Sequence, residues 1–247
     1  MSDGVVVQGE QGLSQVERVV DTFVAPTKTF TDTLRCTSWW LPFLLSAVMT
    51  LCVTVVIDRH VGFDRVVENQ IHNSPKQEDE MANLTPEQRS GRMKGMITGY
   101  RYTSYAAPVI VLLVSAIGAL GLWGSFNFGL GAQTTFGQML CVWMYAWLPK
   151  MLSGLLTIIA LYFGGSNDGF DLKDPVGTNL GYYLPDAPAW LKAGLSFFDV
   201  LGLWVLFLLV IGTAIVAKVS RGKAAAVVVG WWVVMLMVSV AMAAAFN

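Results

Sequence analysis

Two charged residues stand out because each lies in or beside a long apolar run. Lys150 occurs in "YAWLPKMLSG", inside the apolar stretch 139–163, and Asp199 directly precedes the charge-free run Val200 to Ala217. A charge within a membrane span is costly and indicates function by default, but a lysine can also extend its ammonium group to the interface. Lys150 is therefore either a functional buried charge or an interfacial lysine beside a kink at Pro149, which lacks a backbone donor.

Asp199 also has two interpretations. At the start of a helix its carboxylate would accept hydrogen bonds from free amides and suit the positive helix end, whereas inside a bundle it would need a cation or inward-facing amides. The sequence favours the capping role. We expect Lys150 to be a poor partner for Asp199, because in one continuous third helix it would lie about 20 Å of helix rise from the end where Asp199 stands.

Residue types that could support catalysis or metal binding do not form a recognisable site. The sequence contains no G-x-S-x-G, Walker or H-E-x-x-H motif. Glu68 and His72 are four residues apart, but two ligands do not make a site. Asp168, Asp171 and Asp174 do not follow the calcium-loop pattern. We therefore predict no catalytic residue, no cofactor and no metal, and a protein that is not an enzyme.

The elements that carry these residues are predicted from composition. The 247 residues are 54% hydrophobic and 13% charged, whereas an average soluble domain is about a quarter charged. A spanning helix needs about 20 apolar residues, and the apolar runs are continuous rather than alternating. The prediction is an all-α, polytopic integral membrane helical bundle with about five transmembrane helices, near 39–57, 106–124, 139–163, 199–217 and 224–245.

The distribution of cations predicts the orientation. Lys218, Arg221 and Lys223 lie in one short connection, which the positive-inside rule places in the cytoplasm. The N-terminus would then be cytoplasmic and the C-terminus outside. The polar extramembrane loop 58–104 opposes this orientation, because it carries seven Lys or Arg residues and would lie outside.

Residues 1–38 form a cytoplasmic amphipathic segment in this scheme. Its apolar residues recur at helical spacing, with three charged residues opposite them, which suits a helix at the membrane interface. The helix would either pack beneath the bundle or offer a partner-binding surface. The apolar set is Leu13, Val16, Val20, Phe23 and Val24, and the charged set is Glu17, Arg18 and Asp21.

Local signals predict further features. Thr85 and Gln88 in "LTPEQ" have the spacing of a helix-capping box, so a helix should begin near residue 86. The segment 164–198 is rich in Gly, Pro, Asn and Asp, which is typical of turns. Small residues in the second span predict close contact with a neighbouring helix. These are Ser115, Gly118, Ala119, Gly121 and Gly124.

Three stretches together resemble a known family. They are "FVAPTKTF", "YAWLPKML" and "SFFDVLGLWVLFLLVIGTAIVAKVSRGKA", and the last carries the most telling positions: Asp199, Trp204, Gly212, Ser220, Lys223 and Ala224. They are similar to bacterial members of the Yip family, the Ypt/Rab-interacting membrane proteins. The resemblance implies a five-span membrane domain over 39–247, in the bacterial cytoplasmic membrane, with the N-terminus inside.

The resemblance also shapes the expected function. Eukaryotic relatives bind prenylated Rab-type GTPases, but their D-L-Y-G-P motif does not occur here. We therefore expect a non-enzymatic protein that organises partner proteins or lipids, with the bilayer and other membrane proteins or a second copy as partners and no nucleic acid. The alternative is a transporter or permeation subunit that uses Lys150. The candidate polar sites are Lys150, Asp199, Pro149, Ser220 and Lys223.

Overall fold

The computed structural model describes residues 12–164, 170–172 and 175–246, and these fold as a bundle of helices. The predicted all-α class is therefore confirmed. Its long helices follow the predicted apolar runs closely, except that the third run is divided in two. They are α3 (Trp40–His60), α7 (Ala107–Gly124), α8 (Phe136–Ala146), α9 (Lys150–Phe163), α11 (Val200–Val216) and α12 (Arg221–Phe246).

Four stretches of the described chain are long and apolar enough to cross a membrane: Trp40–His60, Ala107–Gly129, Phe136–Phe163 and Arg221–Ala245. The remaining predicted span, α11, has 17 residues. Such a helix is about 25 Å long, which is less than the bilayer core of about 30 Å. The short helix α10 (Ala189–Ser196) precedes α11 and packs against α12, so α10 and α11 together lie along one long partner.

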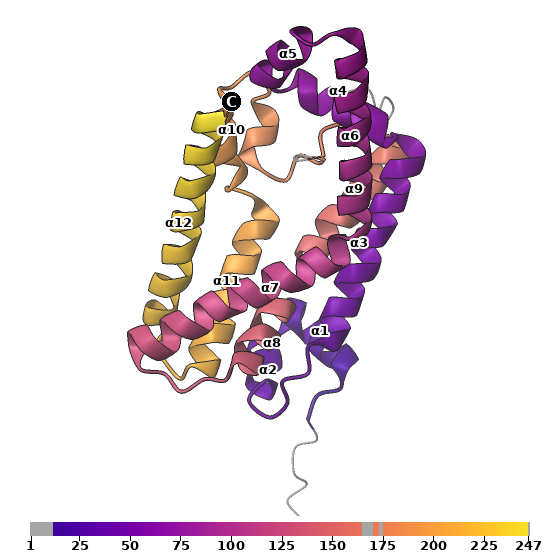
Figure 1. Cartoon of the computed structure of the whole chain (residues 1–247). Coiled ribbons are helices and arrows are strands. Elements are labelled where there is room, and N and C mark those ends of the chain that lie inside the picture. Colours follow the sequence, from indigo (N-terminus) through magenta and orange to yellow (C-terminus); the bar gives the residue numbers. More distant parts are fainter. Residues whose placement is uncertain (1–11, 165–169, 173–174, 247) are drawn as a thin grey trace, which may run out of the picture.

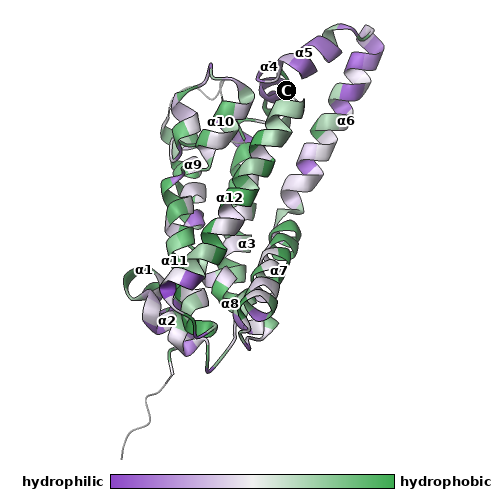
Figure 2. Ribbon diagram, turned by 90° about the vertical axis from the view of Figure 1, so that its left-hand side faces the viewer, coloured by the Kyte–Doolittle hydropathy of each residue, from purple (hydrophilic) through white to green (hydrophobic). Residues whose placement is uncertain are grey.

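The two ends of the bundle carry different elements (Figure 1). Helices α1 (Gln15–Val24), α2 (Pro26–Asp32) and α8 lie at one end, and the C-terminal end of α12 lies at the other. Figure 2 shows hydrophobic residues along α7, α11 and α12, and hydrophilic residues gathered in the cap formed by α4, α5 and the outer part of α6. The placement of α1 and the C-terminal end of α12 at opposite ends is the one expected for an odd number of passes; which end is cytoplasmic stays a prediction.

The loop 58–104 is itself helical. It contains α4 (Phe63–His72), α5 (Pro75–Ala82) and α6 (Pro86–Tyr105). Thr85 Oγ1 accepts a hydrogen bond from Gln88 N, and Gln88 Oε1 accepts one from Thr85 N, which confirms the predicted capping box. A small apolar core holds the cap together, built on Val67, Ile71 and Met81.

Helix α11 lies at the centre of the main core, against α2, α8 and α12. Phe30 from α2, Tyr145 from α8 and Leu208 from α11 are all completely buried. Gly212 permits this packing, because a Cβ there would lie 2.6 Å from Val142 and 3.0 Å from Phe30. The N-terminal segment is thus part of the core through α2.

Helix α7 packs against α8 through its small residues, as the sequence predicted. Ser115 and Ala119 are buried, and a Cβ on Gly118 would lie 2.2 Å from the ring of Trp143. Gly124 is different: a Cβ there would meet nothing within 4 Å, so the expectation of a close approach at this position was wrong.

Candidate functional site

The third apolar run is interrupted directly before Lys150. Helix α8 ends at Ala146 and α9 begins at Lys150, and the amides of Lys150, Met151 and Leu152 each bond a carbonyl three residues back, at 3.0 Å. Pro149 lies in this turn and has no N–H to offer an α-helical bond. The interruption places Lys150 in the first turn of α9 rather than within a continuous helix.

A second interruption lies before α11. Asp199 is the N-cap of this helix, and its Oδ1 accepts hydrogen bonds from Leu201 N at 2.7 Å and Gly202 N at 3.1 Å. This confirms the predicted capping role. An extended segment reaches the same point: Val200 N donates to the carbonyl of Thr178 at 3.0 Å, and Asn179 forms an antiparallel bridge with Asp199.

The two interruptions meet. Lys150 Nζ lies 2.6 Å from Asp199 Oδ2, and Thr178 Oγ1 lies 3.5 Å from the same oxygen. The prediction that Lys150 would be a poor partner for Asp199 was therefore wrong. That prediction treated Asp199 as the outer end of the fourth span. In the structure α10, which precedes Asp199 in the sequence, also packs along α12, so the carboxylate lies within the bundle.

The depth of the pair follows from the helices on either side. Helix α9 has 14 residues beyond Pro149 and α11 has 17 residues beyond Asp199, which extend about 21 Å and about 25 Å in opposite directions. Figure 1 shows α9 rising from this level and α11 descending from it. The side chains are 34% exposed for Lys150 and 11% for Asp199. Pairing with Lys150 and two backbone amides supplies the partners that a carboxylate at this depth requires.

A second polar cluster fixes the N-terminal helices. Arg18 is completely buried, and its Nε donates to Asp32 Oδ2 at 2.6 Å. The hydroxyls of Thr22 and Thr29 both donate to the Arg18 carbonyl, and Tyr145 Oη of α8 donates to Gln15. Burial opposes ionisation of Asp32, but hydrogen bonds from Arg35 and Arg18 hold its pKa below the ordinary value.

Helix α1 exposes a row of apolar side chains beside the exposed Glu17. Val16, Val20 and Val24 are 66%, 54% and 73% exposed, and their four-residue spacing places them on one side of the helix. We call these three residues the valine stripe. Arg18, predicted on the polar face opposite the apolar residues, points instead into the protein.

Ser220 and Lys223 lie at the other end of α11, away from the Lys150–Asp199 pair. Ser220 Oγ accepts a hydrogen bond from Lys223 N at 3.3 Å and so caps the start of α12. Lys223 itself is exposed. The structure thus brings together three of the five candidate polar residues, Lys150, Asp199 and Pro149, and leaves these two apart.

The family model for the Yip1 domain matches residues 20–242, which is most of the chain. The chain belongs to the Yip1 domain family. No curated protein and no solved structure matches it.

The positions that carried the resemblance have structural roles in this Yip1 domain. Asp199 caps α11, the ring of Trp204 packs edge-on against Phe23 of α1 at 5.6 Å, and Gly212 admits Phe30 of α2. These contacts join α11 to the N-terminal helices. Sequence reasoning missed two polar contacts, that of Thr178 and Asn179 with Asp199 and that of Arg18 with Asp32. The polar stretch around Thr178 carries no pattern that could have placed it beside Asp199.

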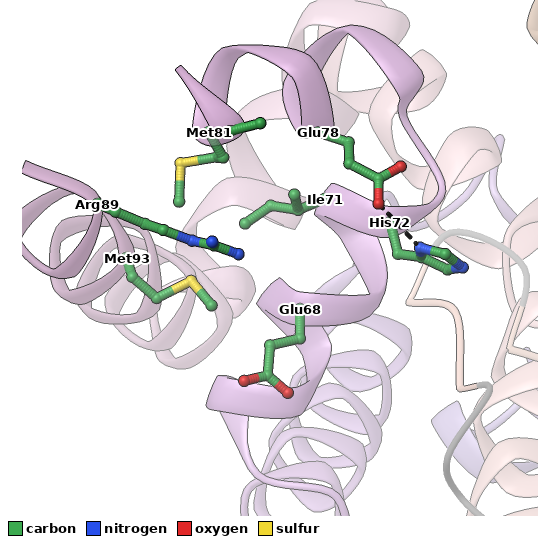
Figure 3. Close-up of a pocket in the computed structure, with 8 residues that line it drawn as sticks. Glu68, Ile71, His72, Glu78, Met81, Arg89 and Met93 are labelled. Carbon is green, nitrogen blue, oxygen red and sulfur yellow. Dashed lines mark hydrogen bonds and ion pairs between the residues drawn. The ribbon is translucent and has the colours of Figure 1, made fainter. Parts of the chain in front are cut away.

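Two of the possible metal ligands, Glu68 and His72, lie in the described cap. Glu68 and His72 line a hollow of about 360 Å³ between α4, α5 and α6 (Figure 3). His72 Nδ1 lies 3.4 Å from Glu78 Oε1, while the Glu68 carboxylate points away from this pair. In the part of the chain that the structure describes, no three His, Cys, Asp or Glu side chains are grouped for a metal ion. Asp168 and Asp174 lie outside the described residues.

Proposed function

We propose that this multi-pass Yip1 domain protein is not an enzyme and organises partner proteins or lipids, with α1 as its contact surface. The observation that carries the proposal is the valine stripe. Three apolar side chains point outward from a helix on which Arg18, one of its three charged residues, is buried. Burying a valine contributes about 1.5–3 kcal/mol, so an uncovered stripe of three is a strong driving force for contact with another apolar surface.

The attachment of α1 supports a binding role. Arg18 forms a hydrogen bond with Asp32 of α2, and Gln15 accepts one from Tyr145 of α8, so α1 is attached to two other helices. A helix that is fixed before binding loses little conformational freedom when a partner arrives. The stripe can therefore act as a preformed surface for a second membrane protein, another copy of this chain or the bilayer interface.

The N-terminal segment is part of the main core through Phe30 of α2. Deleting the N-terminal segment would remove Phe30 from the core, so point changes are required. A photoreactive amino acid at Val20 should cross-link to the partner in membranes. Adding Val16→Gln and Val24→Gln should reduce the adduct severalfold, because both changes place an amide in the contact.

The matched control changes exposed positions of the adjacent helix, Thr27→Gln and Thr31→Gln, and should leave the adduct unchanged. Mass spectrometry of the adduct distinguishes a protein partner, a second copy and phospholipid, each of which supports the proposal. A probe at Val20 that forms no adduct with protein or lipid would contradict it.

A specific observation favours transport as the second candidate. Two interrupted helices meet within the bundle at the Lys150–Asp199 pair, and many transporters bind substrates and ions where discontinuous helices meet near the bilayer midplane. If the pair carries ions, purified protein in liposomes should dissipate an imposed pH gradient. Lys150→Met should abolish that flux while Lys28→Met, on the exposed face of α2, leaves it intact. Equal flux in the wild type and Lys150→Met would exclude this candidate.

A further inference from the structure

A hollow of about 480 Å³ opens at the end of the bundle that carries α1 and α2. It lies where the end of α2, the connection into α8 and the end of α11 come together. Its apolar wall includes Leu34, Ala132 and Val216, and its polar wall is formed by Gln133, Gln138 and Lys218. This volume is within the range of about 300–1,000 Å³ that small-molecule sites occupy.

The polar wall offers hydrogen-bond donors. Lys218 is exposed and has no ion pair with the described part of the chain. Gln138 Oε1 already accepts a hydrogen bond from Thr135 N at 2.9 Å, which leaves its amide N–H groups to donate. No Asp or Glu occurs among the residues that line the hollow. A lysine and amide donors without a neighbouring acid are compatible with an anion.

The backbone at Lys218 is an independent observation. Lys218 has a φ of 54°, and in the described chain it is the one residue other than glycine with positive φ. Its N–H bonds the carbonyl of Ile215, and the N–H of Val219 bonds that of Ala214. This is the helix-ending motif in which glycine normally occupies the left-handed position. A lysine at this point places an ammonium group at the hollow at the expense of backbone strain.

The hollow lies where the apolar part of the chain begins. The membrane-competent stretch Arg221–Ala245 starts three residues after Lys218. Leu34, which also lines the hollow, is 40% exposed. The donors therefore lie beside the start of a membrane-competent helix, with apolar side chains in the same lining. Basic pockets between spans bind anionic lipid headgroups.

We propose that this hollow binds the phosphate group of an anionic phospholipid, with the part of the acyl chains nearest the headgroup against Leu34 and Val216. Lys218 and the amides of Gln133 and Gln138 hold the phosphate oxygens. The site is separate from both the valine stripe and the Lys150–Asp199 pair. Its failure would leave the proposed function standing, and failure of the stripe would leave this site unaffected.

The test is native mass spectrometry of the full chain, purified in detergent and titrated with phosphatidylglycerol or neutral phosphatidylcholine. We expect phosphatidylglycerol to be retained in preference. Lys218→Gln should reduce its retention about fivefold, the contribution of one cation near a charged lipid surface. Lys223→Gln is the matched control, because it removes an exposed cation from the same end that does not line the hollow.

A second variant separates binding from folding. Lys218→Gly relieves the left-handed strain, so its thermal unfolding temperature should equal or exceed that of the wild type while its phosphatidylglycerol retention falls as in Lys218→Gln. Equal retention of the two lipids would overturn the proposal, as would equal losses in Lys218→Gln and Lys223→Gln. Displacement of the lipid by millimolar glycerol phosphate would assign the site to a soluble phosphate instead.

Discussion

Lys150 Nζ and Asp199 Oδ2 are 2.6 Å apart, and this contact joins the first residue of α9 to the residue that caps α11. One carboxylate therefore has two tasks: Oδ1 accepts from the amides of α11, and Oδ2 accepts from the ammonium group. The two interrupted helices are fixed to each other at the point where neither has a continuous backbone ladder. The pair therefore links α9 directly to α11.

Lys150→Met should destabilise the protein by about 1–3 kcal/mol, the cost of leaving a buried acceptor without its partner. Adding Asp199→Asn should recover most of this loss, because asparagine still caps a helix but carries no charge. Thermal unfolding in detergent, followed by tryptophan fluorescence, measures the effect. If the double variant is no more stable than Lys150→Met alone, the two residues do not form a stabilising pair.

The Arg18–Asp32 contact predicts a pH dependence. The pKa of Asp32 is lowered from 3.8 in the folded protein, so its contribution to stability is complete above that pH and is lost as the pH falls through the folded pKa. Unfolding temperatures measured between neutral pH and about pH 3 should show this loss in the wild type. Asp32→Asn should have a smaller decline over the same range, and identical declines would contradict the prediction.

The cations at the two ends of the bundle predict its orientation in the membrane. Two of the loop cations are paired with acids, Arg92 with Glu80 and Arg101 with Asp58. The cations of the α11–α12 connection have no such partners in the described chain, and they lie at the end that carries α1 and α2. We expect that end to be cytoplasmic. Alkaline phosphatase fused after residue 247 should be active, and a fusion at the α11–α12 connection inactive; the reverse pattern would invert the topology.

The helices were predictable because apolar runs and caps are local signals. Thr85 and Asp199 cap helices where their neighbours in sequence indicated. The junction between Lys150 and Asp199 was not predictable in the same way. An apolar run has the same composition whether its helix is continuous or interrupted, and the depth of Asp199 depends on α10, a helix within the segment 164–198 that was expected to form turns.

The direction in which α1 faces was also beyond local reasoning. The spacing of its valines correctly predicted an amphipathic helix. Whether Arg18 faces water or protein depends on Asp32, which is 14 residues away on α2. A buried arginine is stable only when such partners are present, and a single sequence gives no sign that they will meet. Tertiary packing therefore decides which face of the helix is free to bind.

Two glycines of α7 provide a matched test of how that helix packs. Gly118→Ala would place a Cβ 2.2 Å from the ring of Trp143, whereas Gly124→Ala would meet nothing within 4 Å. Overpacking costs about 1–3 kcal/mol, while alanine in an open helical position gains up to about 1 kcal/mol over glycine. Gly118→Ala should therefore lower the unfolding temperature in detergent, and Gly124→Ala should hold or raise it. Equal shifts in the two variants would show that α7 does not approach α8 at Gly118.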